Sequence, residues 1–395
     1  MPDSPDSPGH PRDDPDSSQG APAGVDPAVP SPARMYNYFL GGRDNFPADR
    51  LAAEKTLSVV PDGRRIALAN RYFLAQATLR MADRGITQFL DLGTGIPTSP
   101  AVHEVAREIT SSARVAYVDN DPVVIAHNKA QLAAIETVRV VHGDIRQPEA
   151  VLADPAIRRL IDFSRPVGLL MVAVLHFITD DQDPGRIVAA FTRELAPGSY
   201  LALSHISSDG TSPEAIATIR DVYTNAAAPA VFRNAAQIRA FFDGFAWEPP
   251  GLIDVVDWFP YSKVFTATPP TVQVLGGLGC KDLSRLPCLI PDLDSTPTPE
   301  AVQDRAMTSL PGRWRAAFSG RILAGWSSGA PTAASSGPIP ACPYRGAPSC
   351  TPPTRTLSRS ESARPGSAIS PQPTPSLRDK RCPRTGPLSV ARPAS

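Results

Sequence analysis

Cysteine is absent from most of this 395-residue chain, because all five cysteines lie at position 280 or later. They include no C-x-x-C pair and no histidine partner at the spacing of zinc ligands. A disulfide framework is therefore not expected, and no metal site is predicted. The five residues are Cys280, Cys288, Cys342, Cys350 and Cys382.

Long apolar runs and an excess of charge are also missing. The longest apolar run, VGLLMVAVLHFI (167–178), is too short to span a bilayer, and the acidic, proline-rich N-terminus is unlike a signal peptide. The chain has 39 basic and 39 acidic side chains, and residues 31–281 are themselves nearly neutral. We therefore expect a cytoplasmic protein that binds neither membranes nor nucleic acid. The sequence indicates no oligomeric state.

Proline, in contrast, is frequent and clusters at both ends. Residues 1–30 are acidic with almost no apolar side chains, and residues 282–395 are rich in Pro, Ser, Thr and Arg without periodicity. Neither segment can bury enough apolar surface to offset chain entropy, so we expect two disordered tails. Residues from about 280 onward have the composition of GC-rich DNA read in a wrong frame. The alternative is a genuine extension that binds a partner through its positive charge.

The central part of the chain alternates strand-like and helix-like segments. Helices are expected at 100–109, 121–135 and 183–195, between the strands of a doubly wound, mostly parallel α/β sheet. Two further helical segments, 31–40 and 65–85, precede the sheet, joined through GGRDNFPADR, and two follow it near 213–226 and 234–245. Seven strands are expected: 87–92, 113–119, 137–144, 166–177, 198–206 and a closing antiparallel pair within 251–259 and 271–279.

A glycine-containing turn follows the first of these strands, in QFLDLGTGIPTSP (88–100). A dinucleotide fingerprint requires G-x-G-x-x-G, in which the third glycine lets the helix pack closely on the strand. Gly93 and Gly95 are present, but Thr98 holds the third position and Pro97 precedes it. The turn therefore favours S-adenosylmethionine (SAM) over a nicotinamide dinucleotide.

Three acids at successive strand ends support the same choice. Asp119 closes the second strand, where a carboxylate can accept both ribose hydroxyls of an adenosine. Asp144 closes the third, where an acid can accept from the adenine amino group, and Asp91 closes the first, where it can orient the ammonium of the methionine part. Asn120 and Ile145, next to these acids, are expected in the same site. For each acid alone, capping of the next turn is an equally good interpretation.

The chain also resembles a known family. The runs SPARMYNYFLGGRDNFPADR, ANRYFL, GITQFLDLGTGIPTSPAVHEVA, ARVAYVDNDPVVIAH, DFSRPVGLLMVAVLHFITDDQDP and PGSYLALSHIS are similar to the actinobacterial S-adenosyl methyltransferase family, formerly a domain of unknown function. The resemblance covers residues 31–281. It implies a Rossmann-like class I methyltransferase fold with SAM as cofactor, but it implies no substrate. Residues 31–85 would form a helical lid and 86–281 the Rossmann-like core.

Four further side chains are candidates for the site. Arg43 in GGRDNF would reach over the cofactor if the N-terminal helices fold down as a lid, and Arg71 could pair with the methionine carboxylate. His176 and His205, each placed at a strand end, could act as general bases, and a buried structural role is an equally good interpretation for each. The acids of DDQD (180–183) suit a helix start better than a magnesium site.

Three functions remain open on the sequence alone. The first is a SAM-dependent methyltransferase that acts on a small or medium-sized molecule. The second is a catalytically silent SAM-binding sensor or partner module, which remains open because no catalytic group is assured. The third is an NAD-dependent oxidoreductase, which Thr98 disfavours.

Overall fold

The computed structural model describes residues 22, 24–258 and 270–281. The expected tail 282–395 and most of the expected tail 1–30 lie outside these residues. Within the described part, no helix combines the length and the apolar character needed to cross a membrane.

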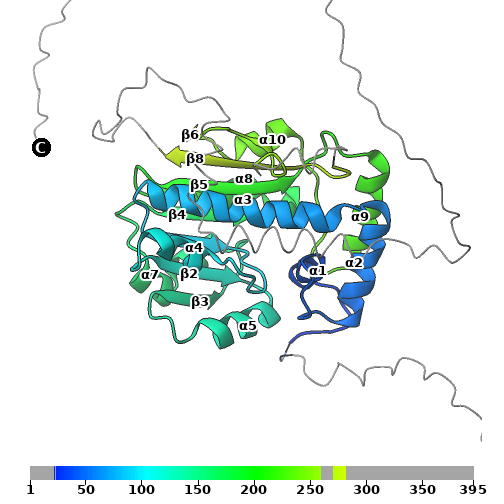
Figure 1. The fold of residues 1–395 in the computed structure, drawn as a ribbon, viewed down its shortest axis with the longest axis horizontal. Helices are drawn as coiled ribbons and strands as arrows, with labels where there is room; N and C mark the ends of the chain where they lie inside the picture. The colour runs from blue at the N-terminus through cyan, green and yellow to red at the C-terminus, as the bar shows by residue number, and fades with distance from the viewer. Residues whose placement is uncertain (1–21, 23, 259–269, 282–395) are drawn as a thin grey trace, which may run out of the picture. The chain divides into compact units, whose positions relative to one another are not determined.

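One mixed sheet forms the centre of the domain (Figure 1). Its strands run in the order β3-β2-β1-β4-β5-β8-β6, with β7 also paired to β8. Strands β1 to β5 are mutually parallel, whereas β8 is antiparallel to β5, β6 and β7. The strand bounds are β1 Gln88–Leu92, β2 Arg114–Asp119, β3 Val138–His142, β4 Gly168–Val172, β5 Tyr200–Ile206, β6 Phe245–Trp247, β7 Ile253–Asp254 and β8 Val274–Lys281.

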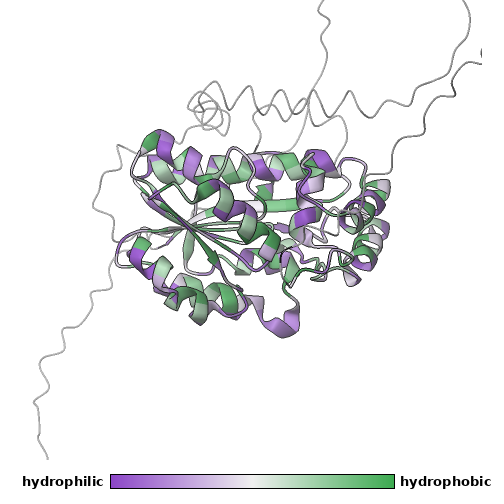
Figure 2. Cartoon of the chain, turned by 90° about the horizontal axis from the view of Figure 1, so that it is seen from below, coloured by the Kyte–Doolittle hydropathy of each residue, from purple (hydrophilic) through white to green (hydrophobic). Residues whose placement is uncertain are grey.

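Apolar side chains on both faces of the strands explain why helices cover the sheet on both sides. Phe89 and Leu90, successive residues of β1, are both buried but belong to different clusters, one on each face. Figure 2 shows the apolar strands lying between two helical layers. The first face carries α3 (Gly63–Asp83), α4 (Val102–Ile109) and α5 (Pro122–Leu132), and the second carries α6 (Pro148–Ala153), α7 (Pro155–Leu160), α8 (Pro184–Glu194) and α10 (Ala235–Ala240).

Helices from both ends of the domain gather near the carboxyl ends of the parallel strands. They are α1 (Pro32–Phe39), α2 (Pro47–Val59) and α9 (Pro213–Thr224) (Figure 1). Helix α2 was not predicted, because 41–50 was interpreted only as a connection. Pro47 in its first turn, with Asp49 accepting from the Phe46 amide at 2.7 Å, is the start signal that the sequence contained.

Three expectations need correction. The described residues form eight strands instead of seven, because the three-residue β6 was missed. Strand β4 ends at Val172 instead of 177, since Ala173 takes a positive φ of 56° and a short 3-10 helix, η2 (Leu175–Phe177), follows. Residues 24–30 are not separate from the domain, because the Pro30 carbonyl accepts from the Ala227 amide at 2.8 Å.

Candidate functional site

A cavity of about 550 Å³ opens at the carboxyl ends of β1, β2, β3 and β4. Strand order reverses at this place, because β1 lies between β2 on one side and β4 on the other. The connections after β1 and β4 therefore diverge to opposite faces and leave a crevice, which is where open α/β sheets bind ligands. The sequence predicted a site at these strand ends, and the topology brings its parts together.

The glycine turn after β1 lines this cavity. Gly93 and Gly95 have φ values of 70° and 68°, which side-chain-bearing residues rarely adopt. A Cβ on Gly93 would also lie 2.4 Å from Val174, whereas a Cβ on Gly95 would meet only open space. The Gly95 amide donates to Asp119 Oδ2 at 2.9 Å, and the Asp121 amide donates to Asp119 Oδ1 at 2.9 Å. Two backbone groups thus fix the Asp119 carboxylate at the cavity wall.

Two of the three predicted acids are buried and have unusual pKa values. Burial raises the pKa of Asp91 to about 7, against the opposing effect of Arg71. Burial likewise raises the pKa of Asp119 to about 6, although backbone amides stabilise its charge. Both carboxyls therefore lack a full counter-charge within the described residues. A cationic or hydroxyl-rich ligand would supply favourable contacts to them.

Arg71, on α3, contacts the end of the glycine turn and acts electrostatically on Asp91. Its Nη2 donates to the carbonyls of Thr98 at 2.6 Å and Pro100 at 3.0 Å, while its buried Nε has no hydrogen-bond partner. The side chain lines the cavity instead of facing solvent. An unused guanidinium donor beside an acid suits the carboxylate and ammonium of a zwitterionic amino-acid group.

The remaining cofactor candidates divide into two groups. Asp144, Asn120 and Ile145 line the cavity. Partial burial raises the pKa of Asp144, but hydrogen bonds from Arg146 outweigh it and hold the pKa below the usual value. Arg43, in contrast, is exposed and does not line the cavity, so the structure gives no support for a cofactor contact from it.

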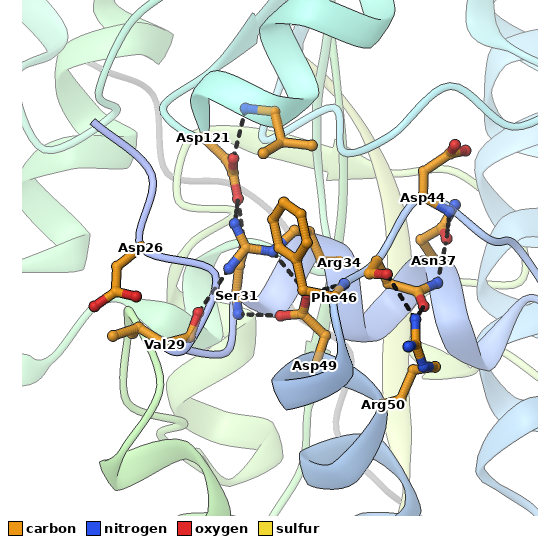
Figure 3. A network of polar contacts seen from close by, with 12 residues as sticks. Asp26, Val29, Ser31, Arg34, Asn37, Asp44, Phe46, Asp49, Arg50 and Asp121 are labelled. Carbon is orange, nitrogen blue, oxygen red and sulfur yellow. Dashed lines mark hydrogen bonds and ion pairs between the residues drawn. The ribbon is translucent and has the colours of Figure 1, made fainter. Parts of the chain in front are cut away.

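The N-terminal helices close one side of the cavity through a buried ionic network that the sequence analysis missed (Figure 3). Arg34 on α1 pairs with Asp49 at 2.9 Å and lies 3.5 Å from Asp121, at the start of α5. Asp49 is fully buried and also accepts from the Ser31 amide at 2.8 Å. The Ser31 hydroxyl donates to Asp121. Arg34 therefore joins α1 and α2 to the strand end that carries Asp119.

The two histidines have different surroundings. His176 lies in η2, lines the cavity, and has a buried Nδ1 without a partner. Burial, followed by His205 and Arg233, lowers the pKa of His176 well below its ordinary value, so the ring is neutral.

His205 lies in β5 and does not line the cavity, so the expectation that it could act as a base is not supported. Its Nδ1 lies 2.7 Å from the Ile206 carbonyl oxygen, and its Nε2 lies 2.8 Å from Arg233 Nη1. Arg233 in turn pairs with Asp180 at 2.6 Å. The last acid of DDQD, Asp183, accepts from the Arg186 amide at 3.0 Å and caps α8, as predicted.

The described chain also places several aromatic side chains in the cavity that sequence reasoning did not select. Tyr36, Phe177 and Tyr223 come from α1, η2 and α9 and line the region beyond the glycine turn. Phe177 and Tyr223 stack with ring centroids 5.5 Å apart. Aromatic residues on amphipathic helices are more often core residues, so the sequence contained no signal that separates them from the core.

Comparisons with known proteins agree with this geometry. The sequence model of a family described as S-adenosyl methyltransferase matches residues 18–282. The crystal structure of a candidate methyltransferase from Thermobifida fusca is 37% identical and covers 66% of this chain and 98% of that chain, with a TM-score of 0.62. A DUF574 family protein from Streptomyces avermitilis is 33% identical and covers 64% and 98%, with a TM-score of 0.61. No curated protein matches the chain.

Proposed function

The chain belongs to the S-adenosyl methyltransferase family, and from this premise we propose that it transfers a methyl group from SAM to a small or medium-sized acceptor molecule. The family match covers the residues that form the sheet and the cavity. The cofactor is SAM. The identity of the acceptor and the roles of single residues belong to the proposal.

The side chains of the cavity suit the parts of SAM. Asp119 would accept hydrogen bonds from the ribose hydroxyls, and Asp91 and Arg71 would bind the ammonium and carboxylate of the methionine part. Asp144, Asn120 and Ile145 would surround the adenine. Arg71 supports this assignment because it lines the cavity and, among the described residues, its guanidinium forms hydrogen bonds only to the backbone carbonyls of Thr98 and Pro100, so a ligand carboxylate would supply the counter-charge.

When bound, SAM supplies a methyl group on a positively charged sulfur, so formation of the acceptor–methyl bond breaks the sulfur–methyl bond and leaves a neutral thioether. His176 would take the proton that an O–H or N–H acceptor loses. A neutral imidazole is able to do so, and burial keeps His176 neutral. The turn that carries His176 follows β4, at the switch point beside the glycine turn.

One observation carries the proposal of a transferase over that of a silent SAM-binding module. The cavity continues past the residues assigned to SAM and reaches His176, Phe177 and Tyr223. A sensor would need only the cofactor part. A cavity wall that adds a neutral histidine and two aromatic rings to the residues assigned to SAM suits a second substrate.

The experiment has two steps. Thermal unfolding with SAM, S-adenosylhomocysteine (SAH) and NAD in parallel tests the cofactor, since a ligand at ~100 times its Kd adds roughly 2.7 kcal/mol to the free energy of unfolding. Stabilisation by SAM and SAH but not by NAD is expected. Release of SAH from SAM is then measured with a panel of small acceptors. Binding of SAM without any turnover on the panel would favour the silent binding module.

A further inference from the structure

The part of the cavity beyond the cofactor residues has walls of a different kind. We name it the acceptor chamber and define it by Tyr36, Leu40, Leu74, Phe177, Ile219 and Tyr223. Leu40 directly follows α1 and the other residues lie on α1, α3, η2 and α9, so the chamber is lined by elements that are far apart in the sequence. Its walls are aliphatic and aromatic.

Among the described residues that line the cavity, the charged side chains either lie outside the acceptor chamber or already form ion pairs or hydrogen bonds. Asp91, Asp119, Asp121, Asp144 and Arg146 lie at or shortly after the strand ends. Arg71, whose charge also acts on Tyr36, donates to the carbonyls of Thr98 and Pro100 and is assigned to the methionine carboxylate. Arg34 is bound to Asp49 and Asp121, and Asp26 is exposed. An ionised acceptor would therefore enter the chamber without a counter-charge, and burial of an unpaired ion is strongly unfavourable.

Aromatic rings form one side of the chamber. The His176 and Phe177 rings meet edge to face with centroids 4.4 Å apart, and Phe177 stacks on Tyr223 at an interplanar angle of 30°. A further ring packed against such a wall gains offset or edge-to-face contact in addition to burial of its apolar area. A ring system would form more favourable contacts with these aromatic side chains than a flexible aliphatic chain would.

Two polar groups in this region lack protein partners. The Tyr223 hydroxyl forms no hydrogen bond within the described part of the chain, although its residue is largely buried and lines the cavity. The His176 ring lines the cavity, and neither of its nitrogens has a hydrogen-bond partner among the described residues, although Nδ1 is itself shielded. The other polar side chains are satisfied, since Asn70 donates to the Tyr36 hydroxyl at 3.0 Å and accepts from the Ser204 hydroxyl at 2.7 Å.

We propose that the acceptor is an uncharged aromatic molecule whose hydroxyl group binds between Tyr223 and His176. The inference rests on the proposed transferase function and specifies its substrate class. The apolar, ring-lined chamber selects the aromatic body, the lack of a free counter-charge among the described lining residues disfavours ionised acceptors, and the two unpartnered polar groups position one hydroxyl.

The test measures binding to the full chain saturated with SAH, so that no turnover occurs. Three probes share one ring system and differ in a single substituent: a naphthol, the corresponding naphthoate and the corresponding naphthylmethylammonium ion. We expect calorimetry at neutral pH to give a Kd for the naphthol at least about tenfold lower than for either ion, corresponding to about 1.4 kcal/mol. Equal binding of either ion, or no binding of the naphthol, would overturn the proposed substrate class.

Two variants distinguish a specific contact with the Tyr223 hydroxyl from nonspecific apolar binding. Tyr223→Phe removes only the unpartnered hydroxyl and should raise the Kd of the naphthol about fivefold. Tyr38→Phe is the matched control, because Tyr38 lies on α1 outside the cavity lining and its hydroxyl bonds Glu54. An unchanged Kd in Tyr223→Phe would contradict the assigned role of this hydroxyl.

SAH affinity and melting temperature, measured for each protein, show whether the cofactor site and the fold are intact. If the unaltered chain failed to bind SAH, the proposed function and this inference would both fall. Normal SAH binding with the wrong probe preference would overturn the inference alone.

Discussion

The two ends of the cavity are built in opposite ways. At the cofactor end, polar groups are fixed by the backbone next to them, as Asp119 is by the amides of Gly95 and Asp121. In the acceptor chamber, Phe177 and Tyr223 stack on each other from two separate elements, and Tyr36 on α1 forms hydrogen bonds with Ala67 and Asn70 on α3. The cofactor end is therefore held by local hydrogen bonds, whereas the acceptor chamber depends on how the N-terminal helices and α9 dock.

This difference agrees with the function proposed for each end. A cofactor common to a whole family can be bound by short strand-end motifs. An acceptor that differs between enzymes is better recognised by side chains on helices and connections, which can change without disturbing the sheet. Arg34 is the link between the two ends, because it joins α1 and α2 to Asp121.

Removal of the Arg34 side chain should have the largest effect on stability. Arg34→Met leaves the fully buried Asp49 without its ionic partner, and we expect the free energy of unfolding to fall by about 3–5 kcal/mol in denaturant titrations. Lys55→Met is the control, because its ion pair with Asp221 is more than half exposed and should contribute less than about 1 kcal/mol. Equal losses in both variants would show that Arg34 is not the link.

The junction between the two ends is tested by His176→Gln. We expect kcat to fall about a hundredfold with any acceptor that the chain methylates, while the KM for SAM stays the same, because the ring is needed for proton removal and not for cofactor binding. His127→Gln, a partly exposed histidine outside the cavity lining, should leave both constants unchanged. A rise in KM with unaltered kcat would assign His176 to binding instead.

The cofactor end is tested by Asp119→Ala. Loss of charge-assisted hydrogen bonds to the ribose should weaken SAM binding by about 1.5–3 kcal/mol in calorimetry. Glu136→Ala removes an exposed acid elsewhere and serves as the charge-matched control. If affinity stayed at the level of this control, Asp119 would not belong to the site.

The raised pKa values predict a pH dependence at the cofactor end only. In the folded protein, Asp91 has a pKa of about 7 and Asp119 a pKa of about 6. Their contribution to the free energy of unfolding of the free protein is therefore greatest at acid pH, where both are protonated, and it is lost as pH rises through these values. A cationic ligand favours the ionised carboxyls, so SAM affinity should rise on the order of tenfold between pH 5.5 and 7, with release of protons. Asp91→Asn should flatten this profile, and a naphthol bound in the acceptor chamber should show no such slope.

The smallest effect is expected from truncation after Lys281, the last residue of β8. The Lys281 amide donates to the Ser199 carbonyl at 2.7 Å, and its Nζ donates to the carbonyls of Thr192 and Leu195. These contacts join the end of β8 to residues that the shortened chain keeps. The shortened chain should keep its melting temperature and SAM affinity, and a loss of several degrees or of tenfold in affinity would show that the tail contributes to either end.

The alternation of apolar residues and the glycine turn were sufficient to predict five parallel strands, most helices and the cofactor end. Asp91, Gly93, Gly95 and Asp119 could be selected because the end of a strand fixes where the next few residues point. The cofactor contacts themselves stay predictions. Short β6 could not be found, because three residues are too few to establish a period.

Only the tertiary structure distinguished residues that look alike in the sequence. His176 and His205 both lie near the ends of apolar segments. The positive φ at Ala173 turns the chain so that His176 lines the cavity. His205 instead contacts Arg233 Nη1 through its Nε2. Asp49 is one of 39 acidic residues, and nothing local marks it as the fully buried partner of Arg34. Local hydrogen bonding and periodicity act over a few residues and can be read from the sequence. The acceptor chamber instead depends on the docking of helices far apart along the chain, which side-chain packing and the buried contacts of Arg34 decide.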